Sequence, residues 1–302
     1  MSFCLIDSAR FKHNINIVSN YIDLHKIAIV IKNNAYGHGL IEMAGLASKN
    51  GIRHAVVINC KEANLVKDFF DTILVLSDTV NEFDSSNIHI AINDLDSIQN
   101  IPKHSKVELK IDTGMHRNGV HVSEINQALD MIDSRQQILK GVFTHFANPY
   151  KGSSMLRQKE KFDKVKEEIN TNYPDKYIRF HCSSSPSIFL ISNEEYDLAR
   201  IGLALYGYVD LPQKKQSQNL KPIMSLWAEK ISCREIVKGD RVGYGGVFQA
   251  KKDMRISTYD IGYGDGFMRL DENKTSKISD GRSIIGRVSM NNLAIAGNDQ
   301  EV

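Results

Sequence analysis

The feature that most constrains the fold is a series of eight short, apolar and largely β-branched runs in the first two-thirds of the chain. They cover residues 27–32, 54–59, 73–77, 88–92, 107–111, 139–145, 178–182 and 198–203. Such runs are typical of parallel strands that are buried on both faces and joined by crossovers. Residues 11–22 and 155–169 carry apolar side chains at helical spacing between runs. Eight strands alternating with helices predict a closed (β/α)8 barrel of the TIM type, although the short third to fifth intervals leave an open doubly wound sheet as an alternative.

The pattern of residues along the chain changes after about residue 208. Residues 213–219 are polar and basic without apolar periodicity, as in a linker. Short apolar runs punctuated by glycine follow, at residues 223–231, 241–248, 254–261 and 283–288. We therefore expect a barrel domain over residues 1–212 and a smaller, mainly β and apparently shortened C-terminal domain over residues 213–302.

Composition excludes several classes of protein. The 38 Lys and Arg residues nearly balance the 36 Asp and Glu residues, and the net charge of +2 favours neither nucleic acid nor anionic lipid as a partner. No run approaches the roughly 18 apolar residues of a membrane span. The four cysteines form no C-x-x-C pair and have no histidine at ligand spacing, so we expect no metal site and a cytoplasmic chain with reduced thiols: Cys4, Cys60, Cys182 and Cys233.

Two lysines follow predicted strands, at the end of a barrel where functional groups gather. Lys32 closes the first apolar run, and Lys110 closes the fifth, with Arg117 one loop further on. A desolvated lysine has a lowered pKa and suits Schiff-base chemistry. On spacing alone, a strand-end lysine that reaches solvent and a surface Lys–Arg pair remain the commoner cases.

Polar residues also accumulate after the last three predicted strands. His145 follows the sixth strand, and His181 ends the seventh, just before three consecutive serines at residues 183–185. The eighth contains Arg200, with Gly202 close behind. Loops after strands seven and eight of barrels often bind phosphate through backbone N–H groups and hydroxyls, so these residues predict a phosphate site.

Seven motifs follow one another along the chain. They are residues 32–39 (KNNAYGHG), 110–120 (KIDTGMHRNGV), 142–147 (VFTHFA), 199–207 (ARIGLALYG), 239–245 (GDRVGYG), 261–267 (IGYGDGF) and 285–290 (IGRVSM). Together they resemble the alanine racemase family, whose members are fold-type III pyridoxal-phosphate enzymes, and the resemblance spans residues 7–294.

The resemblance implies that the barrel binds pyridoxal 5'-phosphate. Lys32 would form the Schiff base, and Arg200 would face the pyridine nitrogen and keep it unprotonated, because a guanidinium is effectively always charged. His181 would orient Arg200, and His145 would lie against the cofactor ring. The phosphate contacts would be Tyr36, Ser185, Gly202 and Leu203, and Ser184 would lie beside the cofactor where the family usually has asparagine.

Racemisation removes a proton from one face of the α-carbon and delivers one to the other, which two bases achieve without moving. By resemblance these bases are Lys32 and Tyr244, the latter supplied by a second subunit, so we expect a head-to-tail homodimer with shared active sites. The tyrosine would be polarised through His145 and Arg200. The resemblance also implies that the substrate carboxylate is bound by Arg117 and Met290. It implies four supporting residues: Lys110, Tyr263, Arg269 and Arg287. Lys110 is the position that is often carbamylated in the family.

The expected function is the interconversion of L- and D-alanine, supplying D-alanine for peptidoglycan. A racemase of the same fold with broader or serine specificity, and a non-catalytic pyridoxal-phosphate-binding barrel, are the alternatives. A decarboxylase of this fold would place a carboxylate at the ring nitrogen, which Arg200 disfavours. Two features depart from the family: Asn291 stands where a carboxylate is usual, and the β-domain looks shortened after Val302, without the further tyrosine that family members carry.

Overall fold

The computed structural model describes residues 2–78, 86–211, 219–269 and 276–297. The described chain forms two compact units. One is Asp7–Ile223, and the other combines Met1–Ile6 with Met224–Val302. The expected linker at residues 213–219 lies outside the described residues except for its last position.

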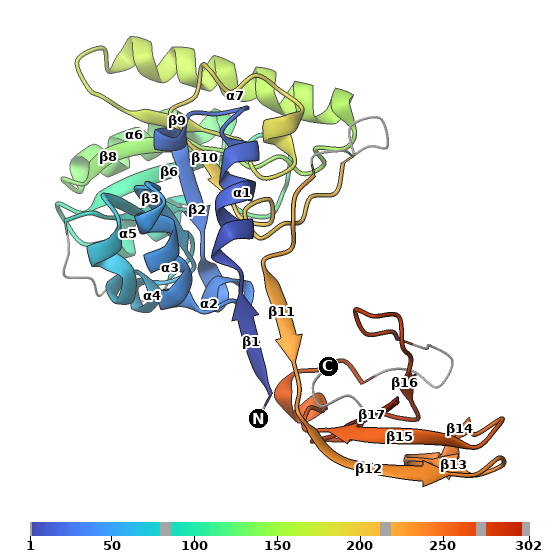
Figure 1. The fold of residues 1–302 in the computed structure, drawn as a ribbon. Helices are drawn as coiled ribbons and strands as arrows, with labels where there is room; N and C mark the ends of the chain where they lie inside the picture. The colour runs from blue at the N-terminus through green and yellow to red at the C-terminus, as the bar shows by residue number, and fades with distance from the viewer. Residues whose placement is uncertain (1, 79–85, 212–218, 270–275, 298–302) are drawn as a thin grey trace. The chain divides into compact units, whose positions relative to one another are not determined.

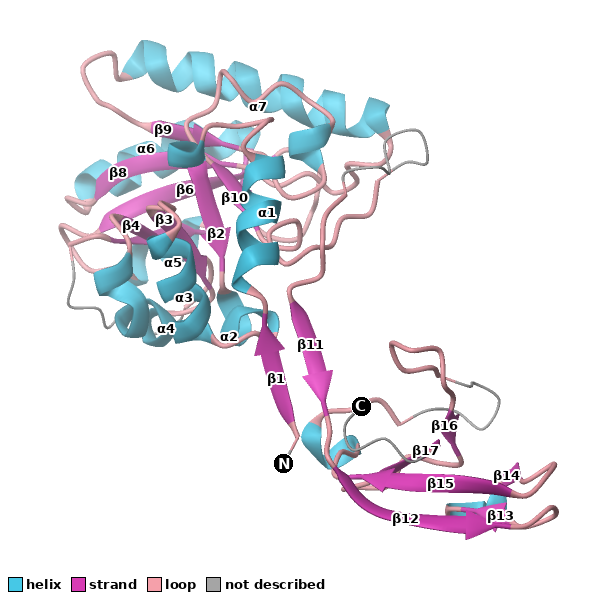
Figure 2. Ribbon diagram, in the orientation of Figure 1, coloured by secondary structure: helices cyan, strands magenta, loops and turns pink. Residues whose placement is uncertain are grey.

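Asp7–Ile223 is a parallel β-barrel surrounded by helices, which confirms the predicted fold class (Figures 1 and 2). All eight predicted runs contain a strand of the barrel sheet. The strands are β2 (Ile27–Val30), β3 (His54–Val57), β4 (Thr72–Val75), β5 (Ile88–Ile92), β6 (Lys106–Asp112), β8 (Ile138–Phe143), β9 (Arg179–His181) and β10 (Ala199–Ile201). The sheet order is β10-β2-β3-β4-β5-β6-β8-β9, and the two-residue strand β7 (Val120–His121) pairs with the end of β6.

The ends of the sheet meet, so the open doubly wound alternative is wrong. A parallel bridge joins Ser184, after β9, to Arg200 in β10, and the Arg200 N–H donates to the Ser183 carbonyl at 3.0 Å. The strands are buried along most of their length because one face meets the helices and the other fills the barrel. Closure brings the carboxyl ends of all eight strands to one rim.

Helices follow most of the strands and turn their apolar faces inward. Helix α1 (Ser8–Val18) buries Phe11, Ile15 and Val18, and its first turn is capped by the Asp7 side chain, which accepts from the Arg10 N–H. The predicted helical pattern near residue 160 is also confirmed in α7 (Gly152–Asn172). The other helices are α2 (Lys32–Tyr36), α3 (Leu40–Lys49), α4 (Cys60–Val66), α5 (Leu95–Asn100) and α6 (Ile125–Ser134), with short 3-10 turns at Leu24–Lys26, Lys67–Phe69, Val122–Glu124 and Ser187–Phe189.

The second unit is mainly β, as predicted. Strand β1 (Phe3–Ile6) pairs antiparallel with β11 (Met224–Trp227). A four-stranded sheet has the order β12 (Lys230–Ile236), β15 (Met254–Tyr259), β17 (Leu293–Ala296) and β16 (Ile284–Ile285), and a small ribbon joins β13 (Arg241–Val242) to β14 (Phe248–Gln249). Single 3-10 turns cover Tyr244–Gly246 and Tyr263–Asp265. An apolar cluster around Tyr259 and Ile295, both fully buried, holds this sheet together. Strand β17 was not predicted, because only one of its four residues is β-branched and two are alanine.

Candidate active site

A cavity of about 640 Å³ opens at the carboxyl ends of the barrel strands. Barrel enzymes carry their functional groups at this rim. Ten of the sequence-predicted residues line it together: Lys32, Tyr36, Lys110, Arg117, His145, Ser184, Ser185, Arg200, Gly202 and Leu203. The structure therefore gathers residues that are up to 171 positions apart into one site.

Lys32 and Tyr36 reach the cavity through a left-handed turn. Strand β2 ends at Val30, two residues earlier than predicted, and residues 33–36 all have φ between 52 and 56°. This conformation costs an L-residue roughly 1–2 kcal/mol, although asparagine tolerates it better than most. Asn34 holds the turn, since its side-chain oxygen accepts from the Leu40 N–H at 2.8 Å and its own N–H donates to Glu62 at 3.1 Å.

The environment of Lys32 destabilises the charged form of its amine. Partial burial lowers its pKa, and the positive charge of Arg117 lowers it further. Lys110, in β6 below the rim, behaves similarly: burial, followed by Arg117 and Arg200, lowers its pKa to about 8. Positive charges crowded into a partly buried site raise the cost of one more charge, so both amines are poised to lose a proton.

The loop that carries Arg117 is built on Asp112, the last residue of β6. The Asp112 carboxylate accepts from the backbone N–H groups of Gly114, Met115 and His116 at 2.9–3.1 Å. These hydrogen bonds outweigh the effect of burial and lower the pKa of Asp112. A charged cap of this kind holds the loop in one conformation and leaves the exposed Arg117 side chain at the cavity wall.

The loops after β9 and β10 form a cradle of backbone N–H groups around Ser185. The Ser185 hydroxyl oxygen accepts from the N–H groups of Gly202 and Ala204, each at 3.1 Å. A serine that accepts two hydrogen bonds still has its own proton to donate. A Cβ on Gly202 would lie 3.2 Å from the Tyr36 hydroxyl, so glycine lets this backbone approach the tyrosine closely. The geometry suits an anion such as phosphate.

Arg200 lines the cavity, and hydrogen bonds to neighbouring residues fix the orientation of its guanidinium. Its guanidinium donates to His181 Nδ1 at 2.6 Å and to the Thr144 carbonyl at 2.6 Å, and it lies 3.3 Å from His145 Nδ1. Burial lowers the pKa of Arg200 to about 10, which leaves it charged at neutral pH. Burial, with Arg200 as the next cause, lowers the pKa of His145 to about 3, so this imidazole is neutral.

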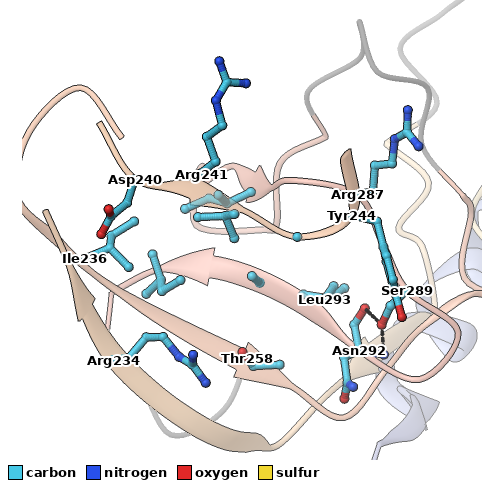
Figure 3. Close-up of a pocket in the computed structure, with 15 residues that line it drawn as sticks. Arg234, Ile236, Asp240, Arg241, Tyr244, Thr258, Arg287, Ser289, Asn292 and Leu293 are labelled. Carbon is cyan, nitrogen blue, oxygen red and sulfur yellow. Dashed lines mark hydrogen bonds between the residues drawn. The ribbon is translucent and has the colours of Figure 1, made fainter. Parts of the chain in front are cut away.

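The remaining predicted residues lie in the β unit. Tyr244 and Arg287 both line a second cavity, of about 580 Å³, and Figure 3 shows them together at one end of it. The Tyr244 side chain is 73% exposed. The Arg287 guanidinium packs against Gly245, 3.5 Å from where a Cβ would lie. The unit thus presents this tyrosine on its surface beside a cation.

Tyr263, Arg269 and Met290 gather around a neighbouring turn of the same unit. The Arg269 guanidinium lies 5.5 Å from the centre of the Tyr263 ring, in a cation–π contact. The Tyr263 N–H donates to the Ser289 carbonyl at 3.0 Å, and Met290 is 57% exposed. These residues therefore lie on the surface of the β unit.

Sequence reasoning missed an ionic layer in the barrel interior beneath the cavity. Glu108 is fully buried and contacts His89, Arg179 and His181. A signal was present, since β6 reads Lys-Val-Glu-Leu-Lys-Ile-Asp, with a charge at every second position. In a strand whose outer face is covered by helices, that alternation predicts charged side chains inside the barrel.

Among the described residues, no group of three or more histidine, cysteine, aspartate or glutamate side chains could hold a metal ion. No helix in the described part of the chain is long and apolar enough to cross a membrane.

The fold and the site define a barrel enzyme with an appended β unit. Two family models match: the alanine racemase N-terminal domain over residues 6–210 and the alanine racemase C-terminal domain over residues 223–302. The chain belongs to the alanine racemase family.

Curated relatives and solved structures agree with this assignment. The chain is 44% identical over 307 residues to the alanine racemase of a Nitratiruptor species, covering 100% of this chain and 90% of the relative. It is 36% identical to that of Campylobacter jejuni subsp. doylei, with the same coverage. The structure of the Acinetobacter baumannii alanine racemase matches with a TM-score of 0.81 at 26% identity, covering 100% and 89% of the two chains. The Clostridium difficile 630 enzyme shares the fold, with a TM-score of 0.87 at 24% identity and coverages of 99% and 85%.

Proposed function

We propose that this chain interconverts L- and D-alanine with pyridoxal 5'-phosphate, as its curated relatives are named to do. The observation that carries the proposal is the cavity itself, where Lys32, the Ser185 cradle and the charged Arg200 lie together. The proposal extends to a cytoplasmic enzyme that supplies D-alanine for peptidoglycan, and this part rests on the family alone.

The residues present fit pyridoxal phosphate. The cradle around Ser185, with Gly202 in it and Leu203 and the Tyr36 hydroxyl beside it, suits the phosphate. Lys32 supplies an amine that loses its proton readily, which a covalent link to an aldehyde requires. When bound, the cofactor withdraws electrons from the α-carbon of the amino acid and so makes its proton easier to remove.

Arg200 controls the polar end of the site. It is charged and only donates hydrogen bonds, so it would donate one to an unprotonated ring nitrogen and would hold its own protons too tightly to transfer one. His181 and the Thr144 carbonyl hold the guanidinium from two sides. The role of this residue is to keep electron withdrawal moderate, which favours racemisation over side reactions.

Arg117 binds the carboxylate of the amino acid from the Asp112-capped loop, and the neighbouring Lys110 supports it. The Lys32 amine would exchange a proton at one face of the α-carbon. Burial and the charge of Arg117 lower the pKa of Lys32, which makes the neutral amine that accepts this proton more accessible. His145 is neutral, and its Nδ1 lies 3.3 Å from Arg200, where it can accept a hydrogen bond from the guanidinium.

The opposite face requires a second base, and Tyr244 of another copy of the chain fills this role. Its hydroxyl is exposed on the β unit, where it can enter a partner's cavity. Tyr263, Arg269, Arg287 and the Met290 backbone, on the same unit, then line the opening of the partner's site. The functional assembly is a head-to-tail homodimer with two shared sites.

The test is an absorbance spectrum of the chain with pyridoxal phosphate, followed by L-alanine and a chiral assay for D-alanine. Lys32→Ala abolishes the lysine-linked absorbance and the activity, whereas Lys110→Ala, which removes the other amine of the cavity, keeps the absorbance. A lysine-linked band in Lys32→Ala would refute the assignment. A band without turnover of alanine, but with turnover of serine, would replace the substrate, and a band without any turnover would indicate a binding protein.

Tyr244→Phe tests the second base. Incorporation of solvent deuterium becomes unequal between L- and D-alanine, because only one face retains its base. Tyr177→Phe is the matched control, since Tyr177 is 77% exposed and lies away from the cavity. Equal and undiminished exchange from both enantiomers in Tyr244→Phe would remove the tyrosine from the mechanism.

A further inference from the structure

The barrel interior contains an ionic layer directly beneath the cavity. Glu108 in β6 is fully buried, and its Oε1 accepts from Arg179 Nε at 3.0 Å and also bonds Arg179 Nη2. His89 Nδ1 lies 2.8 Å from the same oxygen. Arg179 also donates to the Thr72 hydroxyl at 2.8 Å. Barrel interiors are usually filled by branched apolar side chains, so a charged layer at this depth calls for a role.

The second oxygen of Glu108 connects this layer to the cavity. Glu108 Oε2 lies 2.7 Å from His181 Nε2, and His181 Nδ1 lies 2.6 Å from Arg200 Nη1. His181 is therefore the link between a buried carboxylate on one side and the arginine of the proposed active site on the other. Phe143 stacks on the imidazole, with ring centres 5.0 Å apart and planes 6° apart, and prevents the ring from tilting.

The direction of each hydrogen bond follows from the chemistry of the partners. A guanidinium only donates, so His181 Nδ1 must accept from Arg200. A neutral imidazole has one donor and one acceptor, so His181 Nε2 carries the proton and donates it to Glu108. Burial lowers the pKa of His181 to about 4, consistent with a neutral ring.

Glu108 remains a pure acceptor in this setting. Burial would raise its pKa, but Arg179 and the hydrogen bonds from His181 and His89 outweigh burial and hold the pKa well below the usual range. The carboxylate therefore accepts on both oxygens at neutral pH. Gly141 in β8 leaves the space it needs, because a Cβ there would lie 2.7 Å from Glu108 Oε2.

We propose that Glu108 is a positioning residue: it fixes the tautomer of His181 and, through it, the orientation of Arg200 toward the cavity. The consequence for catalysis rests on the racemase function proposed above. The consequence for the tautomer does not, because it follows from the donors and acceptors alone.

Glu108→Gln tests this with almost no change of shape. An amide has one accepting and one donating end. Arg179 can only donate, so the amide oxygen must face Arg179 and the NH2 group must face His181. His181 Nε2 then becomes the acceptor, the proton moves to Nδ1, and the ring confronts Arg200 donor to donor. The bond between His181 and Arg200 is lost.

The readout is the ¹⁵N spectrum of the imidazoles in full-length protein labelled on histidine, which distinguishes protonated from unprotonated ring nitrogens. The His181 signals are assigned by their absence in His181→Asn. We expect the Nε2–H form in wild type and the Nδ1–H form in Glu108→Gln. In the cofactor-loaded enzyme, kcat falls roughly 10- to 100-fold, the range common when the partner of a catalytic group is removed, and KM changes far less.

His89→Gln is the matched control. His89 contacts the same carboxylate at Oε1 and has no contact with His181. It should leave the His181 tautomer as in wild type, with kcat within about threefold. A layer that is merely structural would respond to both substitutions alike, and equal losses of kcat in the two variants would overturn the proposal.

A double variant guards against misfolding, because Glu108→Gln leaves the Arg179 charge buried without its partner. In Glu108→Gln with Arg179→Met, the amide is free to turn its oxygen toward His181. The Nε2–H form and part of kcat should then return. An unchanged tautomer in Glu108→Gln, or a double variant that is folded but keeps the Nδ1–H form, would refute the role of Glu108. A wild-type chain without racemase activity would instead refute the proposed function, while the tautomer measurement would still decide the positioning role.

Discussion

Replacing Gly141 by alanine adds one methyl group beside the ionic layer without changing any charge. The new Cβ would lie 2.7 Å from Glu108 Oε2, 2.9 Å from Arg179 Cγ and 3.0 Å from Glu108 Cδ. Contacts below 3 Å cannot persist, so the carboxylate must move. It cannot move freely, because hydrogen bonds from His89, Arg179 and His181 hold both of its oxygens.

The magnitude follows from three effects. Overpacking of a filled core costs about 1–3 kcal/mol. Displacing the carboxylate weakens at least one hydrogen bond to a charged group, worth about 1.5–3 kcal/mol. Alanine in place of glycine returns about 0.5–1 kcal/mol through the lower entropy of the unfolded chain. The expected net loss in the free energy of unfolding is therefore about 1.5–5.5 kcal/mol.

Gly45→Ala is the control, because Gly45 lies inside helix α3 and its Cβ would meet only Phe69 Cε1 at an ordinary 3.6 Å. This variant should be more stable than wild type by about 0.5–1 kcal/mol. Urea unfolding followed by far-UV circular dichroism measures both, since the α-helices of the described chain all belong to the barrel unit. A Gly141→Ala midpoint equal to that of wild type or of Gly45→Ala would show that the ionic layer is not rigid.

Three further predictions concern the barrel. His181 is neutral in the fold, because its pKa is lowered from 6.5 to about 4. Between these two pH values only the unfolded chain binds a proton at this residue, so its contribution of about 3 kcal/mol is present above pH 6.5 and is lost as the pH falls toward 4. A free energy of unfolding that stays constant across this window would contradict the prediction. Asn34→Ala loses the hydrogen bond to the Leu40 N–H and puts alanine at φ 54°. Urea unfolding should show a loss of about 1.5–3 kcal/mol, and Asn34→Gly should recover the part that comes from the backbone conformation. Equal stability of the two variants would mean that this φ angle is not strained. Asp112→Ala removes the cap of the loop that carries Arg117. It should lower the free energy of unfolding by about 1–2 kcal/mol and raise KM for alanine more than it lowers kcat. An unchanged KM would show that Asp112 does not position Arg117.

Much of the fold could be predicted from local patterns. The eight apolar runs each contain a barrel strand, and the amphipathic segments around residues 11 and 162 form helices α1 and α7. Burial on both faces is recorded in the composition of each strand, so no neighbour needs to be known. Strand β17 escaped this reasoning because only one of its four residues, Ile295, is β-branched and two are alanine.

The proposed site was predictable to the extent that its residues follow strands. Lys32, Lys110 and Arg200 were found because the carboxyl ends of parallel strands in a barrel share one rim. The left-handed turn after Lys32 was not foreseen, since its φ angles depend on contacts with Leu40 and Glu62. Neighbouring residues impose such a conformation, and local preference alone disfavours it.

The sequence by itself determined which residue types are available and in what order the strands present them. Only the tertiary structure decided which of them interact. Glu108, His181 and Arg200 lie on three strands separated by up to 92 positions, and no spacing along the chain predicts their pairing. The tautomer of His181 depends on a donor on one side and an acceptor on the other, and barrel closure is what puts both within hydrogen-bond distance.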